Sequence, residues 1–248
     1  MKSLKYENPG FTATGLFLFA LLLILNLDGF AQSKDPDKIL EKVKEEFSKI
    51  EDYEVDVHVK LDVEFLKMPE SDSKVYFKQP DKAHIESNRF AMLPKEGLNF
   101  SPLSLLNEKY TALYEKEDSI DNIRVSVVKV IPIGNDNDII LTTFWIDQKR
   151  NVIIKVESSK KPMGTFQLEF TYKKYDDKYY MPATMIFTFT VDRTKFPKGM
   201  DGQLESGGED DAKKSKSLTG KVFLSYKNYK INQGIPDSLF ETDKEEKK

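Results

Sequence analysis

The longest regular pattern in the sequence is a strict alternation of apolar and polar residues from position 53 to position 65. Its apolar positions are Tyr53, Val55, Val57, Val59, Leu61, Val63 and Phe65. In an extended chain, successive side chains point to opposite faces of a sheet. The alternation therefore predicts one long strand with an apolar face and a polar face, and it places His58 on the polar face.

A helical spacing precedes this strand. Asp35 and Pro36 are residue types preferred at the N-cap and at the first helical position. The apolar residues that follow recur three or four positions apart: Ile39, Leu40, Val43, Phe47 and Ile50. This spacing predicts an N-terminal helix with a single apolar stripe.

Further strand-like stretches fill most of the remaining chain. They are residues 74–78, 83–88, 110–116, 122–131, 138–147, 152–158, 164–173, 179–193 and 218–230. Polar turns at 147–151 and 176–178 predict hairpins, and consecutive hairpins form an antiparallel sheet. Because nearly every strand has an apolar face and few helices are available to cover it, the sheet should curl around that face. The predicted fold is mainly β (α+β), an incomplete, half-open barrel of about ten or eleven strands.

The segments between the strands predict a short helix and a mobile loop. Ser101 and Pro102 repeat the pattern of a helix start and are followed by Leu103, Leu105 and Leu106. We expect a helix at 101–109 that lies over the opening of the barrel. Residues 197–217 are rich in charge and glycine and poor in apolar residues, which favours a mobile loop. The charged tail is 241–248.

The N-terminus has the pattern of an export signal. Lys2 and Lys5 precede an apolar run at 16–27, which is shorter than the roughly 20 residues needed to span a bilayer. Gly29 and Ala31 supply small residues before a cleavage point. We expect residues 1–31 to be a cleaved signal peptide and 32–240 to be a single periplasmic domain without a lipid-anchoring cysteine. A retained membrane anchor is the alternative.

Composition excludes several kinds of chemistry. The chain of 248 residues has no cysteine, two histidines and a net charge of −3. The absence of cysteine excludes disulfides, thiolate nucleophiles and iron–sulfur clusters. The mildly acidic balance argues against nucleic acid as a partner. The sequence contains no Gly-x-Ser-x-Gly elbow, phosphate-binding loop or dinucleotide fingerprint.

A metal site is also not expected. Residues 136–138 resemble the start of a calcium loop, but Leu141 occupies the position where that loop needs glycine. We therefore expect no catalytic residue, metal or cofactor, and we do not expect an enzyme. What remains is an apolar interior, either an ordinary packed core or a hollow that accepts an acyl chain.

Several segments, taken in order, resemble one family. They are residues 39–65, 76–81, 100–106, 143–147, 229–232 and 235–240. Together they resemble the LolA-like periplasmic lipoprotein carriers, a superfamily that also contains LolB-like receptors and RseB-like regulators. Two features depart from the family: residues 90–98 lack its Asp-Gly turn, and the loop at 197–217 is atypical. These departures leave open which lipid or lipoprotein the protein would carry.

The resemblance implies an unclosed barrel whose cavity takes the acyl chains of lipoproteins or lipids. The expected cavity residues are Val55, Val57, Val59, Leu61, Val63, Phe65, Phe166, Leu168, Phe170, Phe187 and Phe189. The expected lid residues are Leu103, Leu105, Leu106, Leu40, Val43 and Phe47, with Arg89 as the nearest candidate for a lid latch.

The resemblance also implies partners, an inner-membrane release complex and an outer-membrane receptor. The alternatives are a lipid-sensing module of the same fold that acts on a membrane regulator, and a hydrolase with a site of another kind.

Overall fold

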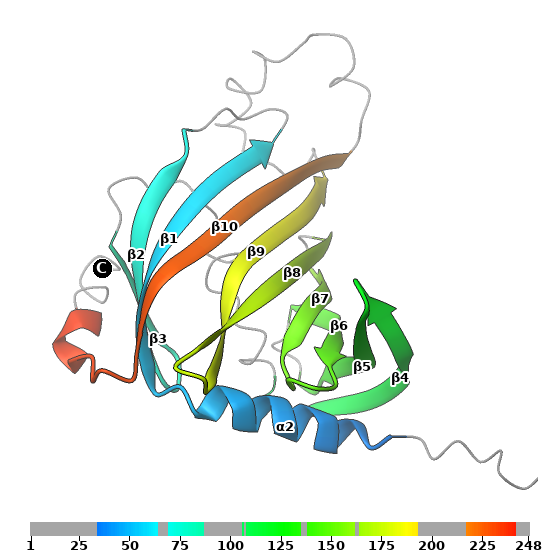
Figure 1. The fold of residues 1–248 in the computed structure, drawn as a ribbon. Coiled ribbons are helices and arrows are strands. Elements are labelled where there is room, and N and C mark those ends of the chain that lie inside the picture. The colour runs from blue at the N-terminus through cyan, green and yellow to red at the C-terminus, as the bar shows by residue number, and fades with distance from the viewer. Residues whose placement is uncertain are drawn as a thin grey trace, which may run out of the picture. The chain divides into compact units, whose positions relative to one another are not determined.

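Ten strands form one continuous sheet in the computed structural model of the chain, and every paired neighbour is antiparallel (Figure 1). The structure describes residues 34–63, 69–86, 106, 108–134, 138–161, 164–192 and 217–241. The chain divides into two compact units, Met1–Lys34 and Asp35–Lys248. All the helices and strands described below belong to the second unit, and only Lys34 of the first unit is described.

The strands confirm the alternation pattern. They are β1 (Asp52–Val63), β2 (Ser71–Lys78), β3 (Lys82–Glu86), β4 (Tyr110–Ile120), β5 (Ile123–Pro132), β6 (Ile139–Asp147), β7 (Ile153–Lys160), β8 (Gly164–Tyr175), β9 (Tyr179–Asp192) and β10 (Ser217–Ile231). Each predicted stretch coincides with one of these strands. The turns expected at 147–151 and 176–178 also lie where the chain reverses.

β4 is longer than its pattern predicted, since it continues past Lys116 to Ile120. The register with β5 shifts between Tyr114 and Lys116, and this bulge interrupts the alternation that marks a strand. The hairpin closes at Asp121 and Asn122, whose φ angles are 48° and 65°. Consecutive left-handed residues of this kind are typical of the tight turns that join antiparallel strands.

The order of the strands shows how the sheet is assembled. It reads β3-β2-β1-β10-β9-β8-β7-β6-β5-β4, so all neighbours are consecutive along the chain except β1 and β10. The pairing of β1 with β10 joins the first and last strands of the sequence in the middle of the sheet. β3 and β4 stand at the two edges and do not pair with each other. The result is a curled sheet that is not closed, which is an incomplete barrel (Figure 1).

The predicted N-terminal helix is α2 (Pro36–Ser48), capped by Asp35. The Asp35 carboxylate accepts hydrogen bonds from the backbone N–H groups of Asp37 and Lys38 at 3.0 and 3.3 Å. The helix runs along one end of the sheet to the edge strand β4 (Figure 1). There the Lys44 ammonium lies 5.5 Å from the ring centroid of Tyr110.

The main hydrophobic cluster occupies the face of the sheet that α2 partly covers. Its buried residues are Leu40, Val43, Val55, Val57, Val59, Leu106, Val128, Val130, Phe144, Ile146, Ile153, Val156, Phe166, Leu168, Met185, Phe187, Val222 and Leu224. A second cluster is built on Ile50, Met181 and Ile231, and a third on Val125, Val152 and Ile154.

The last element of the described chain is a short 3₁₀ helix, η4 (Asp237–Phe240), in which Phe240 is buried. Within the described ranges, no helix combines the length and the apolar composition that crossing a bilayer requires.

The predicted C-terminal end of the mid-chain helix, at residue 109, was wrong. Leu106 is helical, but Glu108 and Lys109 are not. The Lys109 carbonyl instead accepts a hydrogen bond of 2.8 Å from the backbone of Ile133, which continues the pairing of β4 with β5. The rest of this helix lies outside the described residues, as do the expected signal peptide, the loop at 197–217 apart from Ser217, and the tail beyond Glu241.

Candidate functional site

Strand register gathers apolar residues from four strands into continuous rows. The rows run from β8 through β9 and β10 to β1: Phe166, Phe189, Gly220 and Val63; Leu168, Phe187, Val222 and Leu61; and Phe170, Met185, Leu224 and Val59. Directly paired residues of adjacent strands lie on the same face of a sheet. Segments distant in sequence therefore form a single apolar surface, which we call the apolar face.

Burial supports this placement for each predicted cavity residue that the structure describes. Val55, Val57, Val59, Phe166, Leu168 and Phe187 are buried members of the main cluster. Leu61, Phe170 and Phe189 are partly buried and pack against it. The side chain of Val63 and the whole of Phe65 lie outside the described residues.

Aromatic rings line the part of the apolar face formed by β8 and β9. The ring centroids of Phe187 and Phe189 are 5.4 Å apart, and those of Phe166 and Phe187 are 5.9 Å apart. Phe189 and Phe170 retain partial exposure although they lie among buried side chains. These rings offer apolar surface that the rest of the described chain does not fully cover.

The predicted lid residues divide between two clusters. Leu40 and Val43 of α2 are buried in the main cluster, and so is Leu106, which is 1% exposed. Phe47 belongs to the second cluster, where its ring centroid lies 5.6 Å from that of Phe77. Leu103, Leu105 and Arg89 lie outside the described residues.

Sequence reasoning missed the part of the apolar face contributed by β5, β6 and β7. These residues are Val128, Val130, Phe144, Ile146, Ile153 and Val156. On β5, the run from Val125 to Val128 is buried at every position, so no alternation reveals which residues face the interior. Val222, Leu224 and Tyr226 of β10 were also missed. Tyr226 lies between the polar residues Ser225 and Lys227, but Phe223 separates Val222 from Leu224 and interrupts the alternation.

A few polar groups interrupt this apolar lining. The hydroxyls of Thr142 and Ser158 are 2.9 Å apart, and both residues are almost fully buried. They occupy the same face as Phe144 and Val156, because these two pairs are separated by two positions on each strand. The Ser73 hydroxyl is buried and has no hydrogen-bond partner among the described residues.

Partly buried tyrosines gather at the end of the apolar face where β1 begins and β10 ends: the ring centroids of Tyr53 and Tyr229 are 5.7 Å apart, and those of Tyr226 and Tyr229 are 6.3 Å apart. Burial raises the pKa of Tyr53 to about 12, and it also raises the pKa values of Tyr172, Tyr226 and Tyr229. The Tyr229 hydroxyl donates to the Pro182 carbonyl at 3.0 Å, and the Tyr172 hydroxyl donates to the Ile153 carbonyl at 2.8 Å. These hydroxyls therefore stay protonated at neutral pH and serve as donors, not as bases.

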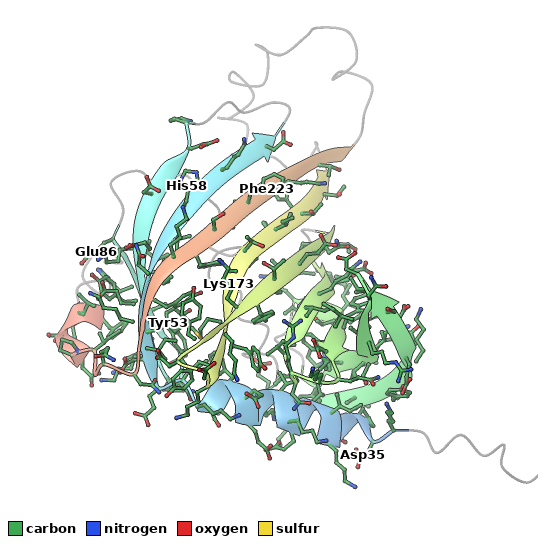
Figure 2. The ribbon with its side chains drawn as sticks, viewed as in Figure 1. Asp35, Tyr53, His58, Glu86, Lys173 and Phe223 are labelled. Atoms are coloured by element: carbon green, nitrogen blue, oxygen red, sulfur yellow. The ribbon has the colours of Figure 1, made fainter. Side chains whose placement is uncertain are left out.

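His58 lies on the polar face of β1, as its position in the alternation predicted (Figure 2). Its ring nitrogens are 2.9 Å from a carboxylate oxygen of Asp72 and 3.1 Å from one of Glu70. The hydrogen bond with Asp72 is the main cause of a raised His58 pKa. His84, on β3, has its ring centroid 6.0 Å from that of Tyr76. Across the described ranges, no group of three or more His, Asp or Glu side chains is placed to hold a metal ion.

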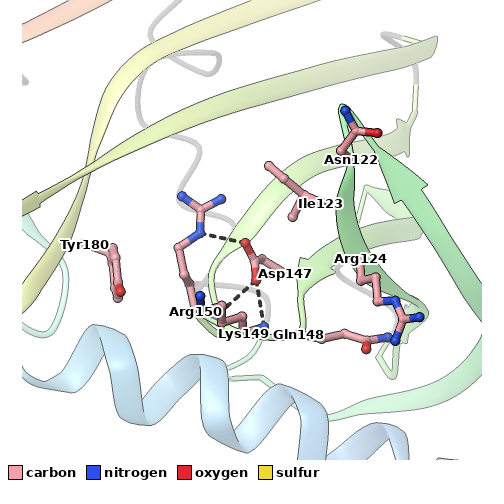
Figure 3. Close-up of a pocket in the computed structure, with 8 residues that line it drawn as sticks. All are labelled: Asn122, Ile123, Arg124, Asp147, Gln148, Lys149, Arg150 and Tyr180. Atoms are coloured by element: carbon pink, nitrogen blue, oxygen red, sulfur yellow. Dashed lines mark hydrogen bonds and ion pairs between the residues drawn. The ribbon is translucent and has the colours of Figure 1, made fainter.

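A separate polar cavity of about 680 Å³ lies at the turns that join β4 to β5 and β6 to β7 (Figure 3). It is lined by Asn122, Ile123, Arg124, Asp147, Gln148, Lys149, Arg150 and Tyr180. Sequence reasoning treated these segments only as turns and strand ends. No motif marks the cavity, because its cationic residues come from hairpins that are brought together only by the fold.

Comparison with known proteins identifies the architecture through structure and not through sequence. No family model and no curated protein matches the sequence. Solved structures of similar fold include an outer membrane lipoprotein-sorting protein domain from Vibrio parahaemolyticus, with a TM-score of 0.53 at 15% identity over 84% of this chain and 98% of that one.

Two further structures are similar to the same extent. A DUF1329 family protein from Desulfovibrio piger has a TM-score of 0.56 at 12% identity, over 85% of this chain and 99% of that one. A LolA superfamily protein from Nitrosomonas europaea has a TM-score of 0.52 at 14% identity, over 84% and 98%. Identities this low establish similarity of fold alone. The described chain, an open antiparallel sheet of ten strands with one helix along its end, has the LolA-like fold.

Proposed function

We propose that this protein binds the acyl chains of lipoproteins or lipids non-covalently on the apolar face and carries them through the periplasm toward the outer membrane. The observation that carries the proposal is the set of apolar rows across β8, β9, β10 and β1. The same rows contain the partly exposed rings of Phe170 and Phe189. The proposal assigns no catalytic step to the chain.

The energetics suit a reversible carrier. Removing one CH₂ group from water contributes about 0.8 kcal/mol, so a sixteen-carbon chain gains on the order of 12 kcal/mol on burial. An open sheet can supply such a surface without closing around the ligand permanently, since its edge strands β3 and β4 are not paired with each other. α2 covers one end of the apolar face with Leu40 and Val43.

The similar structures add support, because the Vibrio protein is an outer membrane lipoprotein-sorting domain and the Nitrosomonas protein belongs to the LolA superfamily. We extend the proposal to the organisation of the chain: a signal peptide at 1–31 that is removed, one domain at 32–240 with a mobile loop at 197–217, and a charged tail at 241–248. The proposed partners are acylated proteins or lipids, an inner-membrane release complex and an outer-membrane receptor.

Native mass spectrometry tests the proposal directly. The protein is purified from periplasm without detergent, its mass is measured, and bound material is extracted with organic solvent. We expect a co-purifying lipid or acylated peptide, or mass increments after incubation with diacyl lipids and lipopeptides. A mass that matches the free chain under both conditions would contradict acyl binding and leave an ordinary packed core.

A matched pair of variants tests whether the ligand binds on the apolar face. Phe189→Glu puts a carboxylate among the rings of Phe166 and Phe187, whereas Thr190→Glu puts the same group on the opposite, exposed face of β9. An unpaired carboxylate buried against hydrocarbon costs several kcal/mol. Affinity for a fluorescent acyl probe should therefore fall at least about a hundredfold in Phe189→Glu only. Equal affinities in the two folded variants would exclude this face as the binding surface.

A further inference from the structure

The polar cavity at the hairpin turns carries a concentration of positive charge. Arg124 stands at the start of β5, while Lys149 and Arg150 form the turn between β6 and β7. Figure 3 shows Arg150 on the side of Asp147 that faces Tyr180 of β9, and Arg124 on the other side of Asp147, beside Gln148. Among the described residues that line the cavity, Asp147 supplies the only carboxylate.

The hydrogen-bond and ion-pair partners of the Asp147 carboxylate lie in its own turn. It is 3% exposed, and its carboxylate accepts hydrogen bonds from the backbone N–H groups of Lys149 and Arg150 at 2.7 and 3.0 Å. Its second oxygen lies 2.6 Å from Nε of Arg150. Burial by itself raises the pKa of Asp147, but these hydrogen bonds outweigh it and hold the pKa below its usual value. The carboxylate is therefore ionised and neutralises Arg150 alone.

Neighbouring side chains hold the guanidinium of Arg150 in a fixed orientation. Its guanidinium carbon lies 5.9 Å from the ring centroid of Tyr172 and 6.0 Å from that of Tyr180. Asp147 engages Nε, and the two terminal nitrogens point away from that carboxylate (Figure 3). A guanidinium presents its N–H groups in a planar fork that matches phosphate oxygens. Fixing the fork in advance reduces the entropy lost when an anion binds.

The remaining cations of the lining, Arg124 and Lys149, form no salt bridge within the described part of the chain. Among the described residues, neither Arg124 nor Lys149 has an acidic side chain within 4.0 Å, the distance of a salt bridge. Both are exposed. The lining therefore retains net positive charge although the whole chain has a net charge of −3.

We propose that this cavity binds a phosphate group. Arg150 supplies its oriented fork, and Arg124 and Lys149 add positive charge to the lining that attracts the anion. The volume of about 680 Å³ exceeds that of a bare phosphate and leaves room for a small organic group beside Ile123 and Tyr180. A phospholipid headgroup and a soluble phosphate ester share this chemistry. The site does not depend on acyl binding to the apolar face.

Isothermal titration calorimetry on the full chain tests the site with three probes: inorganic phosphate, glycerol 3-phosphate and dihexanoyl phosphatidylglycerol below its micelle concentration. The test variants are Arg124→Gln and Lys149→Gln, singly and combined. The control is Lys173→Gln, which removes one positive charge from an exposed position on β8 outside the cavity (Figure 2). Each test variant should weaken phosphate binding about two- to fivefold, the range expected when one exposed positive charge near a bound anion is removed. Lys173→Gln should bind as the wild type does.

The outcomes separate the sources of the phosphate. If the phospholipid binds more tightly than glycerol 3-phosphate and the double variant removes the difference, the site takes a headgroup. If glycerol 3-phosphate binds at least as tightly, the site takes a soluble ester. Dihexanoylglycerol, which lacks the phosphate, reports acyl binding alone, so failure of the acyl proposal is visible separately. Binding of every phosphate probe unchanged in the double variant, or binding of none, would overturn the assignment.

Discussion

The carboxylate of Asp52 ties the start of β1 to the turn that follows β10. Its oxygens accept hydrogen bonds from the backbone N–H groups of Gln233 at 3.0 Å, Gly234 at 3.0 and 3.3 Å, and Ile235 at 3.2 Å. Asp52 is 4% exposed. Its backbone carbonyl also accepts from the N–H of Asn232 at 2.9 Å. The Asp52 side chain therefore holds the turn that follows β10 against the start of β1.

Replacing Asp52 by Asn keeps the size of the side chain but removes its charge and one acceptor oxygen. The introduced amide group would face backbone N–H donors, of which that of Ile235 is buried. Hydrogen bonds to charged groups contribute about 1.5–3 kcal/mol each, and a buried donor left without a partner costs a similar amount. We expect the free energy of unfolding to fall by about 2–4 kcal/mol.

Equilibrium unfolding in urea, followed by circular dichroism, measures this loss. Asp62→Asn is the matched control, because Asp62 lies on the same strand and is exposed. That substitution should change the free energy of unfolding by no more than about 0.5 kcal/mol. If Asp52→Asn and Asp62→Asn unfold at the same urea midpoint with the same slope, the carboxylate does not hold the β10 turn and the reasoning fails.

Two further predictions concern the helix and the polar face. Leu40→Ala should lower the free energy of unfolding by about 2–5 kcal/mol in the same urea assay, because Leu40 is fully buried. Glu41→Ala, on the exposed side of the helix, should lower it little. The raised pKa of His58 means that its ionised form stabilises the fold below the ordinary histidine pKa of about 6.5, and that this contribution is lost as the pH rises through the raised pKa. Asp72→Asn should lower the His58 pKa in an NMR titration; an unchanged pKa would contradict the pairing.

The strands and the helix were predictable because their signals are local. Alternation from Tyr53 onward identified β1 and the polar position of His58, and Asp35-Pro36 identified the start of α2. Two strands extend clearly beyond their predicted ends: β2 begins at Ser71 and not at residue 74, and β4 continues past Lys116, where it contains a bulge at the point where the prediction stopped. A bulge changes which residues face the interior, so alternation on one side of it says nothing about the other side.

Candidate site residues were predictable only where a single face of the strand is buried. Phe166, Leu168 and Phe187 alternate with polar neighbours, and the structure places them on the apolar face. Val128 and Phe144 were missed because their neighbours on the opposite face are buried as well. Where both faces are covered, hydrophobicity no longer distinguishes interior from exterior.

The sequence by itself determined the type and number of elements, since alternation and capping depend only on residues a few positions apart. Only the tertiary structure decided that β1 pairs with β10, that apolar residues from distant strands form common rows, and that Arg124 and Arg150 line one cavity. These features depend on strand register and on the curl of the sheet. Both arise from contacts between segments that are distant along the chain, and a local pattern carries no record of them.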